Sequence, residues 1–156
     1  MGLFPKSKNC EYILVVVDYV YKWVEAMPCR ATDAKNSKKM FEEIIFPRFR
    51  VPKMVISDGG THFTNKNFHN YLSKQGIHHN VATPYHPQTS GQAKTSNKQI
   101  KNIMQKTVNE MATAWKDKLP DALWAYIMAY KTPLGMLPSN SFMAYHLPIE
   151  LEFKAH

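Results

Sequence analysis

The sequence predicts an α/β fold with a mixed β-sheet, and two observations support this. Short apolar segments typical of buried strands alternate with longer amphipathic segments typical of helices. Hydrophobic residues make up 44% of the 156 residues, which is enough to build a core. We expect one domain with an N-terminal arm over residues 1–9, a core over residues 10–132 and a C-terminal extension over residues 133–156.

The first strands are marked by apolar, β-branched runs. EYILVVVD, residues 11–18, ends in Asp18, and its unbroken apolar character predicts a strand buried on both faces. KWVEAMPC, residues 22–29, follows so closely that an antiparallel return is expected. PKMVISDGG, residues 52–60, reads as a further strand that ends in Asp58, where two glycines allow a turn.

Helices are indicated by apolar residues at a spacing of three and four. Thr32 and Asp33 are candidate caps for the first helix, and Pro47 is expected to end it. Further helices are expected over residues 65–75, over about 92–111, and from Trp115 to beyond Met128. A short strand is expected in IHHNVATPY, and Pro133 and Pro138 indicate an irregular tail.

Charge and cysteine content narrow the classes of partner. Lys and Arg number 20 against 12 Asp and Glu, which gives a net charge of +8 and a pI near 9.5. This favours a polyanion such as nucleic acid, and a merely soluble basic surface is the alternative. Cys10 and Cys29 match neither a disulfide framework nor a zinc pattern, so we expect buried free thiols in a reducing compartment. The sequence shows no signal peptide and no transmembrane segment.

Two aspartates at the ends of apolar strands form the sharpest candidate site. If the strands ending in Asp18 and Asp58 were parallel neighbours, both carboxylates would meet at one edge of the sheet, where open α/β sheets place their sites. Carboxylate oxygens suit Mg²⁺ or Mn²⁺, and two such ions about 3.5–4 Å apart stabilise the attacking and leaving oxygens of phosphoryl transfer. The alternative is that each aspartate is a solvated turn residue at a strand end.

Five stretches of the sequence together resemble one known family. They are YILVVVDYVYKWVEA, VISDGGTHF, ATPYHPQTSGQ, LWAYIMAYKTPLGMLP and HLPIELEFKA, and they extend over nearly the whole chain. They resemble the integrase catalytic core of gypsy-type LTR retrotransposons, of the kind abundant in plant genomes. The resemblance implies an RNase H-like fold with a five-stranded mixed sheet, DNA integration by polynucleotidyl transfer, and a site for Mg²⁺ or Mn²⁺ built from two aspartates and a glutamate. Asp18 and Asp58 match the two aspartates.

The third position of that site departs from the family pattern. The family separates its glutamate from the second aspartate by 35 residues, and here that count leads from Asp58 to Lys94. Lysine reverses the charge beside the metal, where unit charges about 4 Å apart interact by about 4 kcal/mol at an effective dielectric constant near 20. A protonated lysine also has no lone pair to offer. We therefore expect metal binding to be weakened or lost and the chemistry to be impaired.

Contacts with DNA are expected on the loop and the helix around this position. The expected residues are Tyr85, His86 and Gln88 in the loop and Lys94, Lys98 and Lys101 in the helix. The lysines share one helical stripe and would contact phosphates, while the resemblance implies that the loop lies over the site. The alternatives are a solvated helix face and a surface loop with incidental polar groups.

The remaining histidine and aromatic residues are expected to be structural. The histidines at 62, 69, 78 and 79 lack zinc-finger spacing and are interpreted as packing or surface residues. Trp115, Trp124 and Tyr130 are expected in the core or in a dimer interface.

The resemblance also implies partners and a location. DNA is the expected partner, a homodimer or higher oligomer is the expected assembly, and the nucleus is the expected compartment. The chain shows neither the His-His-Cys-Cys zinc domain nor the basic C-terminal β-domain that accompany such cores, so we expect that it does not complete integration alone. Two alternatives stay open: a non-enzymatic DNA-binding or dimerisation module, and an inactive fragment derived from such a core.

Overall fold

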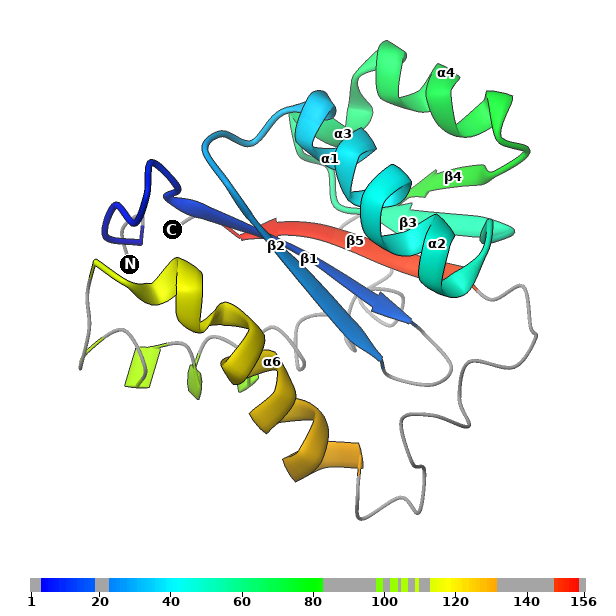
Figure 1. The fold of residues 1–156 in the computed structure, drawn as a ribbon. Coiled ribbons are helices and arrows are strands. Elements are labelled where there is room, and N and C mark those ends of the chain that lie inside the picture. Colours follow the sequence, from blue (N-terminus) through cyan, green and yellow to red (C-terminus); the bar gives the residue numbers. More distant parts are fainter. Residues whose placement is uncertain are drawn as a thin grey trace.

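The chain is built around one mixed sheet that has helices on both faces (Figure 1). The computed structural model describes residues 4–18, 23–82, 98–99, 102–103, 105–106, 109, 113–131 and 148–154, with side chains described for all but 130–131 and 148–154. The spatial order of the strands is β2 (Val24–Cys29), β1 (Tyr12–Asp18), β5 (Pro148–Lys154), β3 (Met54–Ser57) and β4 (His78–Val81). β1 is antiparallel to both of its neighbours, whereas β3 is parallel to β5 and to β4. The predicted α/β class is confirmed.

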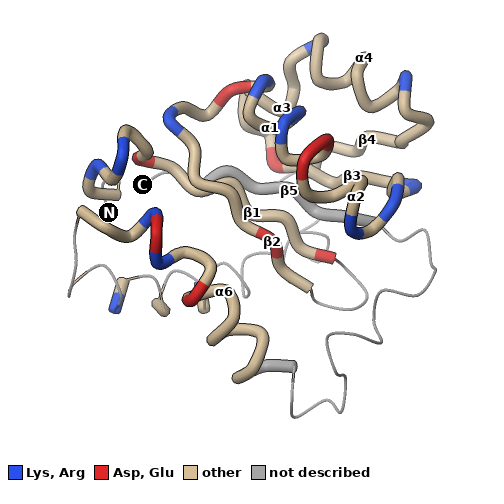
Figure 2. Tube along the Cα trace, in the orientation of Figure 1, with Lys and Arg blue, Asp and Glu red and all other residues tan. Residues whose placement is uncertain are grey.

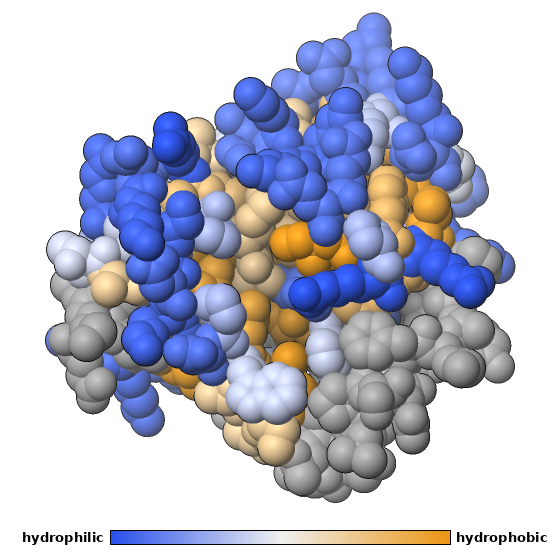
Figure 3. Space-filling view, viewed as in Figure 1, coloured by the Kyte–Doolittle hydropathy of each residue, from blue (hydrophilic) through white to orange (hydrophobic). Residues whose placement is uncertain are grey.

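The helices divide between the two faces of the sheet. They are α1 (Ala34–Met40), a π-helical turn η1 (Phe41–Ile45), α2 (Phe46–Phe49), α3 (Thr61–Thr64), α4 (Lys66–Lys74) and α6 (Trp115–Lys131). Figure 1 shows α1 to α4 on one side of the strands and α6 on the other. In the space-filling view, hydrophilic residues cover the outer surfaces of α1 and α4, and hydrophobic residues show between these helices and α6 (Figure 3). Residues described between 98 and 109 are helical, and most of the predicted helix over 92–111 lies outside the described residues.

Strand β1 is buried on both faces, as its sequence predicts. Ile13, Val15 and Val17 belong to a core cluster with residues of α6, including Trp115 and Leu119. The alternate residues of the strand belong to a second cluster, which contains Leu14 and Val16 together with Met40, Phe41, Phe63, Phe68 and Leu72. Side chains of a strand point alternately to opposite faces, so one apolar run serves two cores.

The first helix begins where expected and continues past its predicted end. Asp33 Oδ1 accepts a hydrogen bond from the Asn36 N–H at 2.8 Å, which confirms Asp33 as the N-cap. Pro47 does not end the segment, because a new helix starts at Phe46 and leaves Pro47 in a first turn, where its missing N–H is not needed. The helical path ends instead at Arg50, whose φ is 65°.

The C-terminal region contains a strand that the prediction of an irregular tail missed. β5 enters the middle of the sheet, where Ile149 pairs with Asp18 on one side and with Val55 on the other. Its sequence, PIELEFK, alternates apolar and acidic residues, which is a strand pattern that could have been recognised. The predicted domain boundaries at residues 9 and 132 stay predictions.

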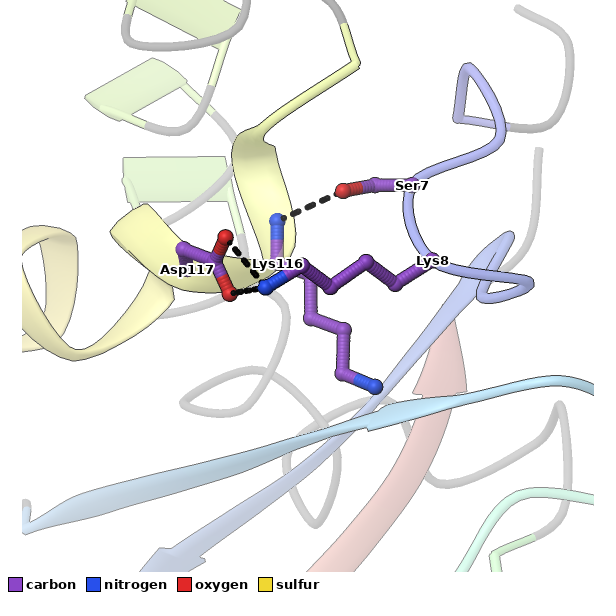
Figure 4. Close-up of polar contacts among 4 residues, drawn as sticks. All are labelled: Ser7, Lys8, Lys116 and Asp117. Atoms are coloured by element: carbon purple, nitrogen blue, oxygen red, sulfur yellow. Dashed lines mark hydrogen bonds and ion pairs between the residues drawn. The ribbon is translucent and has the colours of Figure 1, made fainter.

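The N-terminal arm docks on the start of α6. The Lys8 ammonium lies 2.7 Å from Asp117 Oδ2, and the Lys116 N–H donates to the Ser7 hydroxyl at 3.3 Å (Figure 4). The Trp115 indole N–H donates to the carbonyl of Pro5, and its ring lies 5.5 Å from that of Phe4. The arm is therefore part of the fold and fixes the first turn of α6.

Candidate active site

Asp58 stands directly after β3, in a tight turn that contains two glycines. Its Oδ1 accepts a hydrogen bond from the Gly60 N–H at 2.9 Å. The hydroxyl of buried Ser57 lies 3.2 Å from the Asp58 carbonyl oxygen and 2.8 Å from His79 Nε2 on β4. This hydroxyl can donate to the carbonyl and accept from the histidine in its Nε2–H tautomer. The turn therefore holds the half-buried Asp58 carboxylate in a defined orientation.

Asp18 lies in a different environment, in the hairpin between β1 and β2. Its N–H donates to the Trp23 carbonyl at 2.8 Å, and it lines a water-sized hollow of about 10 Å³ together with Trp23 and Glu25. Buried Glu25 accepts hydrogen bonds from Trp23 Nε1 at 2.9 Å and from Arg48 Nη1 at 2.6 Å. The hollow beside Asp18 is thus shared with a glutamate that is already ion-paired to Arg48.

The two aspartates do not converge in this sheet. β5 lies between β1 and β3, antiparallel to β1 and parallel to β3, so β1 and β3 run in opposite directions (Figure 1). Asp18 is level with Val55, and Asp58 lies three residues further along. Three strand residues span about 10 Å, and two strand spacings add about 9–10 Å across the sheet. The condition for convergence, that the two strands be parallel neighbours, is not met, because β5 lies between them.

This arrangement does not fit a metal centre shared by both aspartates. Ions that cooperate in phosphoryl transfer lie about 3.5–4 Å apart, which is far less than the separation of these two strand ends. In the part of the chain that the structure describes, no group of three or more His, Cys, Asp or Glu side chains is placed to hold a metal. The Asp58 carboxylate is fixed by the Gly60 N–H, and its role as a metal ligand stays a prediction.

The predicted DNA contacts fall mostly outside the described residues. Lys98 is helical and exposed, as a phosphate contact requires. The other predicted contacts are Tyr85, His86, Gln88, Lys94 and Lys101, and these lie outside the described residues. The structure thus supports only the exposure of Lys98.

Histidines around the Asp58 turn pack as the sequence suggested. The His79 ring meets the edge of Phe68 at 5.6 Å and lies 5.7 Å from His69, and the His62 ring meets Phe63 at 4.3 Å. Burial lowers the pKa of both His62 and His79. The carboxylates of Asp58 and Asp33 oppose this shift at His62, whereas His69 adds to it at His79.

His79→Gln should reduce the pH dependence of stability below neutral pH. The folded-state pKa of His79 lies below its ordinary value of 6.5, so the unfolded chain takes up the proton first as the pH falls. The stability associated with the neutral ring is complete above pH 6.5 and is lost as the pH falls through the folded-state pKa. Urea unfolding across this range measures the slope of the free energy of unfolding against pH.

His78→Gln is the matched control for this prediction. His78 precedes His79 on β4 and is exposed, so its replacement should leave the slope close to that of the natural chain. An unchanged slope in His79→Gln would show that the ring does not couple protonation to folding.

The cysteine and tryptophan predictions can be compared directly with the structure. Cys10 and Cys29 are free and buried as expected, and burial raises the pKa of the Cys29 thiol to about 12. Trp115 is fully buried in the core, whereas Trp124 is 59% exposed on α6. The side chain of Tyr130 is not described.

None of the described helices is both long enough and apolar enough to span a bilayer.

Fold and site together define a class: an α/β protein with a mixed, helix-covered sheet and a strand-end aspartate fixed by a glycine turn. The family model described as "Integrase core domain" matches residues 3–87, which is more than half of the chain. The chain therefore belongs to the integrase core domain family, whose core is RNase H-like.

Known proteins similar to this chain include retroviral polyproteins. The Pro-Pol polyprotein of simian foamy virus type 3 (strain LK3) is 30% identical over 147 residues, which cover 94% of this chain and 12% of that protein. The Pol polyprotein of feline endogenous virus ECE1 is 35% identical over 136 residues, which cover 86% of this chain and 13% of that protein. The chain thus spans only about an eighth of the length of these relatives.

A solved structure shows the same fold. It is the cryoEM structure of the simian T-cell lymphotropic virus intasome in complex with PP2A regulatory subunit B56 gamma. The match has a TM-score of 0.65 and 24% identity, and it covers 76% of this chain and 43% of that chain.

Proposed function

We propose that this chain is the integrase catalytic-core domain of a gypsy-type LTR retrotransposon polyprotein, with a site impaired by Lys94. The match of residues 3–87 to the integrase core family carries this proposal. The similarity to Pol polyproteins over most of the chain supports an origin in a larger polyprotein. The motifs VISDGGTHF and ATPYHPQTSGQ support the gypsy-type, plant-like subgroup.

The proposed chemistry is metal-dependent polynucleotidyl transfer, with Mg²⁺ or Mn²⁺ as the expected ion. The fixed turn around Asp58 supports this residue as a metal ligand. The same role for Asp18 has no geometric support, because Asp18 lies beside Glu25 at another part of the sheet.

Impairment follows from the charge at position 94. Counted from Asp58, Lys94 occupies the place of the family's glutamate. A cation there repels a divalent ion and supplies no lone pair. Metal binding is thus weakened or lost, and with it the joining of DNA strands.

DNA remains the proposed partner even without catalysis. The net charge of +8 favours a polyanion, and exposed Lys98 fits the expected phosphate-contacting stripe. Tyr85, His86 and Gln88 are proposed to help to place the DNA. Assembly into homodimers or higher oligomers and a nuclear location complete the proposal.

A DNA-joining assay tests this function. The protein would be extended by its flanking polyprotein regions and given a short duplex with a retrotransposon-like end and Mn²⁺. The natural sequence should form no joined product, whereas Lys94→Glu should form product that depends on Mn²⁺ and disappears with Asp58→Asn. Equal product from the natural sequence and from Lys94→Glu would refute the proposed impairment.

A dimerisation or DNA-binding module without catalysis is the second candidate. Trp124 and Met128, four residues apart on α6, are 59% and 46% exposed. Large apolar side chains at this spacing share a helix face, which suits an interface between proteins. Mn²⁺-independent oligomers that are lost on Trp124→Ser, with no joining by Lys94→Glu, would favour this candidate.

A further inference from the structure

A basic groove lies beside α1, on a surface that the predicted DNA contacts do not include. Its volume is about 730 Å³, and its walls come from the end of β2, from α1 and from the start of α6. Five basic side chains line it: Arg30, Lys35, Lys38, Lys39 and Lys116. Among the described residues, two carboxylates line it as well, those of Asp33 and Glu42. The groove therefore carries an excess of three positive charges.

The basic residues of the groove differ in how far their charge is already compensated. Lys38 lies 3.8 Å from Glu42, and Lys39 lies 3.9 Å from Glu43. Arg30, Lys35 and Lys116 form no ion pair with any residue that the structure describes. These three cations come from the bend after β2, from α1 and from α6, so the fold gathers them in one concave surface.

The N-terminal arm contacts the start of α6, which forms one wall of this groove. The Lys116 N–H bonds to Ser7, and Lys8 neutralises Asp117, which would otherwise place an unpaired carboxylate next to Lys116. Figure 4 shows the Lys116 ammonium directed away from this pair. On the opposite wall, the Asp33 carboxylate is bonded to the Asn36 N–H as a helix cap. The carboxylates of Asp117 and Asp33 are therefore each engaged in a contact of their own.

We infer that this groove binds the phosphodiester backbone of duplex DNA. Guanidinium and ammonium groups on a concave surface suit successive phosphates, and contacts of this kind do not depend on sequence. Figure 2 shows basic positions along α1 and at the start of α6, two helices that both contribute residues to the groove. The choice of DNA over other polyanions rests on the proposed function.

The groove also has a relation to the candidate site. Asp33, which lines the groove, and Asp58 both favour the charged form of His62, against the larger effect of burial. The groove would add to affinity without reading sequence.

Arg30→Ala with Lys35→Ala tests the inference, because both side chains are exposed and neither forms an ion pair with a described residue. Affinity for a short mixed-sequence duplex, measured by fluorescence anisotropy over a salt series, should fall by at least about tenfold near 0.1 M salt. The slope of log affinity against log salt should decrease in magnitude by about two, since two phosphate contacts are removed. The conservative pair Arg30→Lys and Lys35→Arg should retain most of the affinity.

Lys66→Ala with Lys74→Ala is the control, because both lysines are exposed on α4 and do not line the groove. An equal loss in both double variants, or no loss in either, would overturn the inference. Polyglutamate binding with the same affinity and the same dependence on Arg30 and Lys35 would also overturn it, in favour of an acidic protein partner. Neither readout requires Mn²⁺ or DNA joining, so a failure of the proposed catalytic ancestry leaves this test interpretable.

Discussion

Gly60→Ala should lower the free energy of unfolding by about 2 kcal/mol, within the range of about 1–3 kcal/mol that overpacking costs. A Cβ at this position would lie 2.6 Å from His62 Cε1 and 2.9 Å from Asp58 Oδ1. Real Cβ atoms do not approach other atoms so closely, so the His62 ring or the Asp58 carboxylate must move. Urea unfolding followed by circular dichroism measures the loss.

Gly59→Ala is a control one residue away. A Cβ on Gly59 would meet no atom within 4 Å, and its backbone is not in the left-handed region. This substitution should be neutral or stabilise by less than about 1 kcal/mol, since alanine restricts the unfolded chain. Equal losses in the two variants would mean that general rigidity of the loop, and not contact with His62 and Asp58, sets the requirement for glycine.

Part of the fold could be predicted from the sequence because its signals are local. The apolar run of β1, the Asp33 cap and the glycines after Asp58 are local signals, and each acts on its own neighbours in the chain. The structure confirms β1 as buried on both faces and Asp33 as the cap. Pro47 misled the prediction because a proline in a first turn is as favourable as a proline after a helix end.

The arrangement of the candidate site depended on information that is not local. Two apolar strands that each end in aspartate do not reveal whether they are neighbours or which way they run. That is decided by β5, which pairs with β1 and β3 from more than 90 residues away in sequence. The alternation in its sequence predicts a strand, but it does not predict where that strand enters the sheet.

The basic groove escaped prediction for a related reason. Arg30, Lys35 and Lys116 share no helical stripe, and two of them are separated by 81 residues of sequence, from Lys35 to Lys116. A stripe such as that of Lys94, Lys98 and Lys101 is visible in sequence because one helix generates it. A surface shared by three elements becomes visible only when the fold brings them together.

Lys94→Glu should increase the affinity for Mn²⁺ by at least about tenfold, because in the proposed site it would exchange a repulsive cation for a ligand. A change of two charge units near a divalent ion exceeds the 1.4 kcal/mol that corresponds to a tenfold change in affinity. Isothermal titration calorimetry of the natural chain and the variant measures this difference. Thermal stability without metal should fall or stay unchanged, since the new carboxylate joins Asp58 without a counter-ion.

Two further substitutions decide which aspartate belongs to the site. In the Lys94→Glu background, Asp58→Asn should abolish the gain in Mn²⁺ affinity. Asp58 is fixed in the turn after β3, and the family spacing pairs it with position 94. Asp18→Asn should leave the gain intact, because Asp18 lies beside Glu25 and is separated from Asp58 by β5. If both substitutions abolish the gain equally, Asp18 and Asp58 act in one centre, and the separation imposed by β5 does not hold when metal binds. If Asp58→Asn alone abolishes it, the family resemblance identifies Asp58 correctly as a ligand and assigns Asp18 incorrectly.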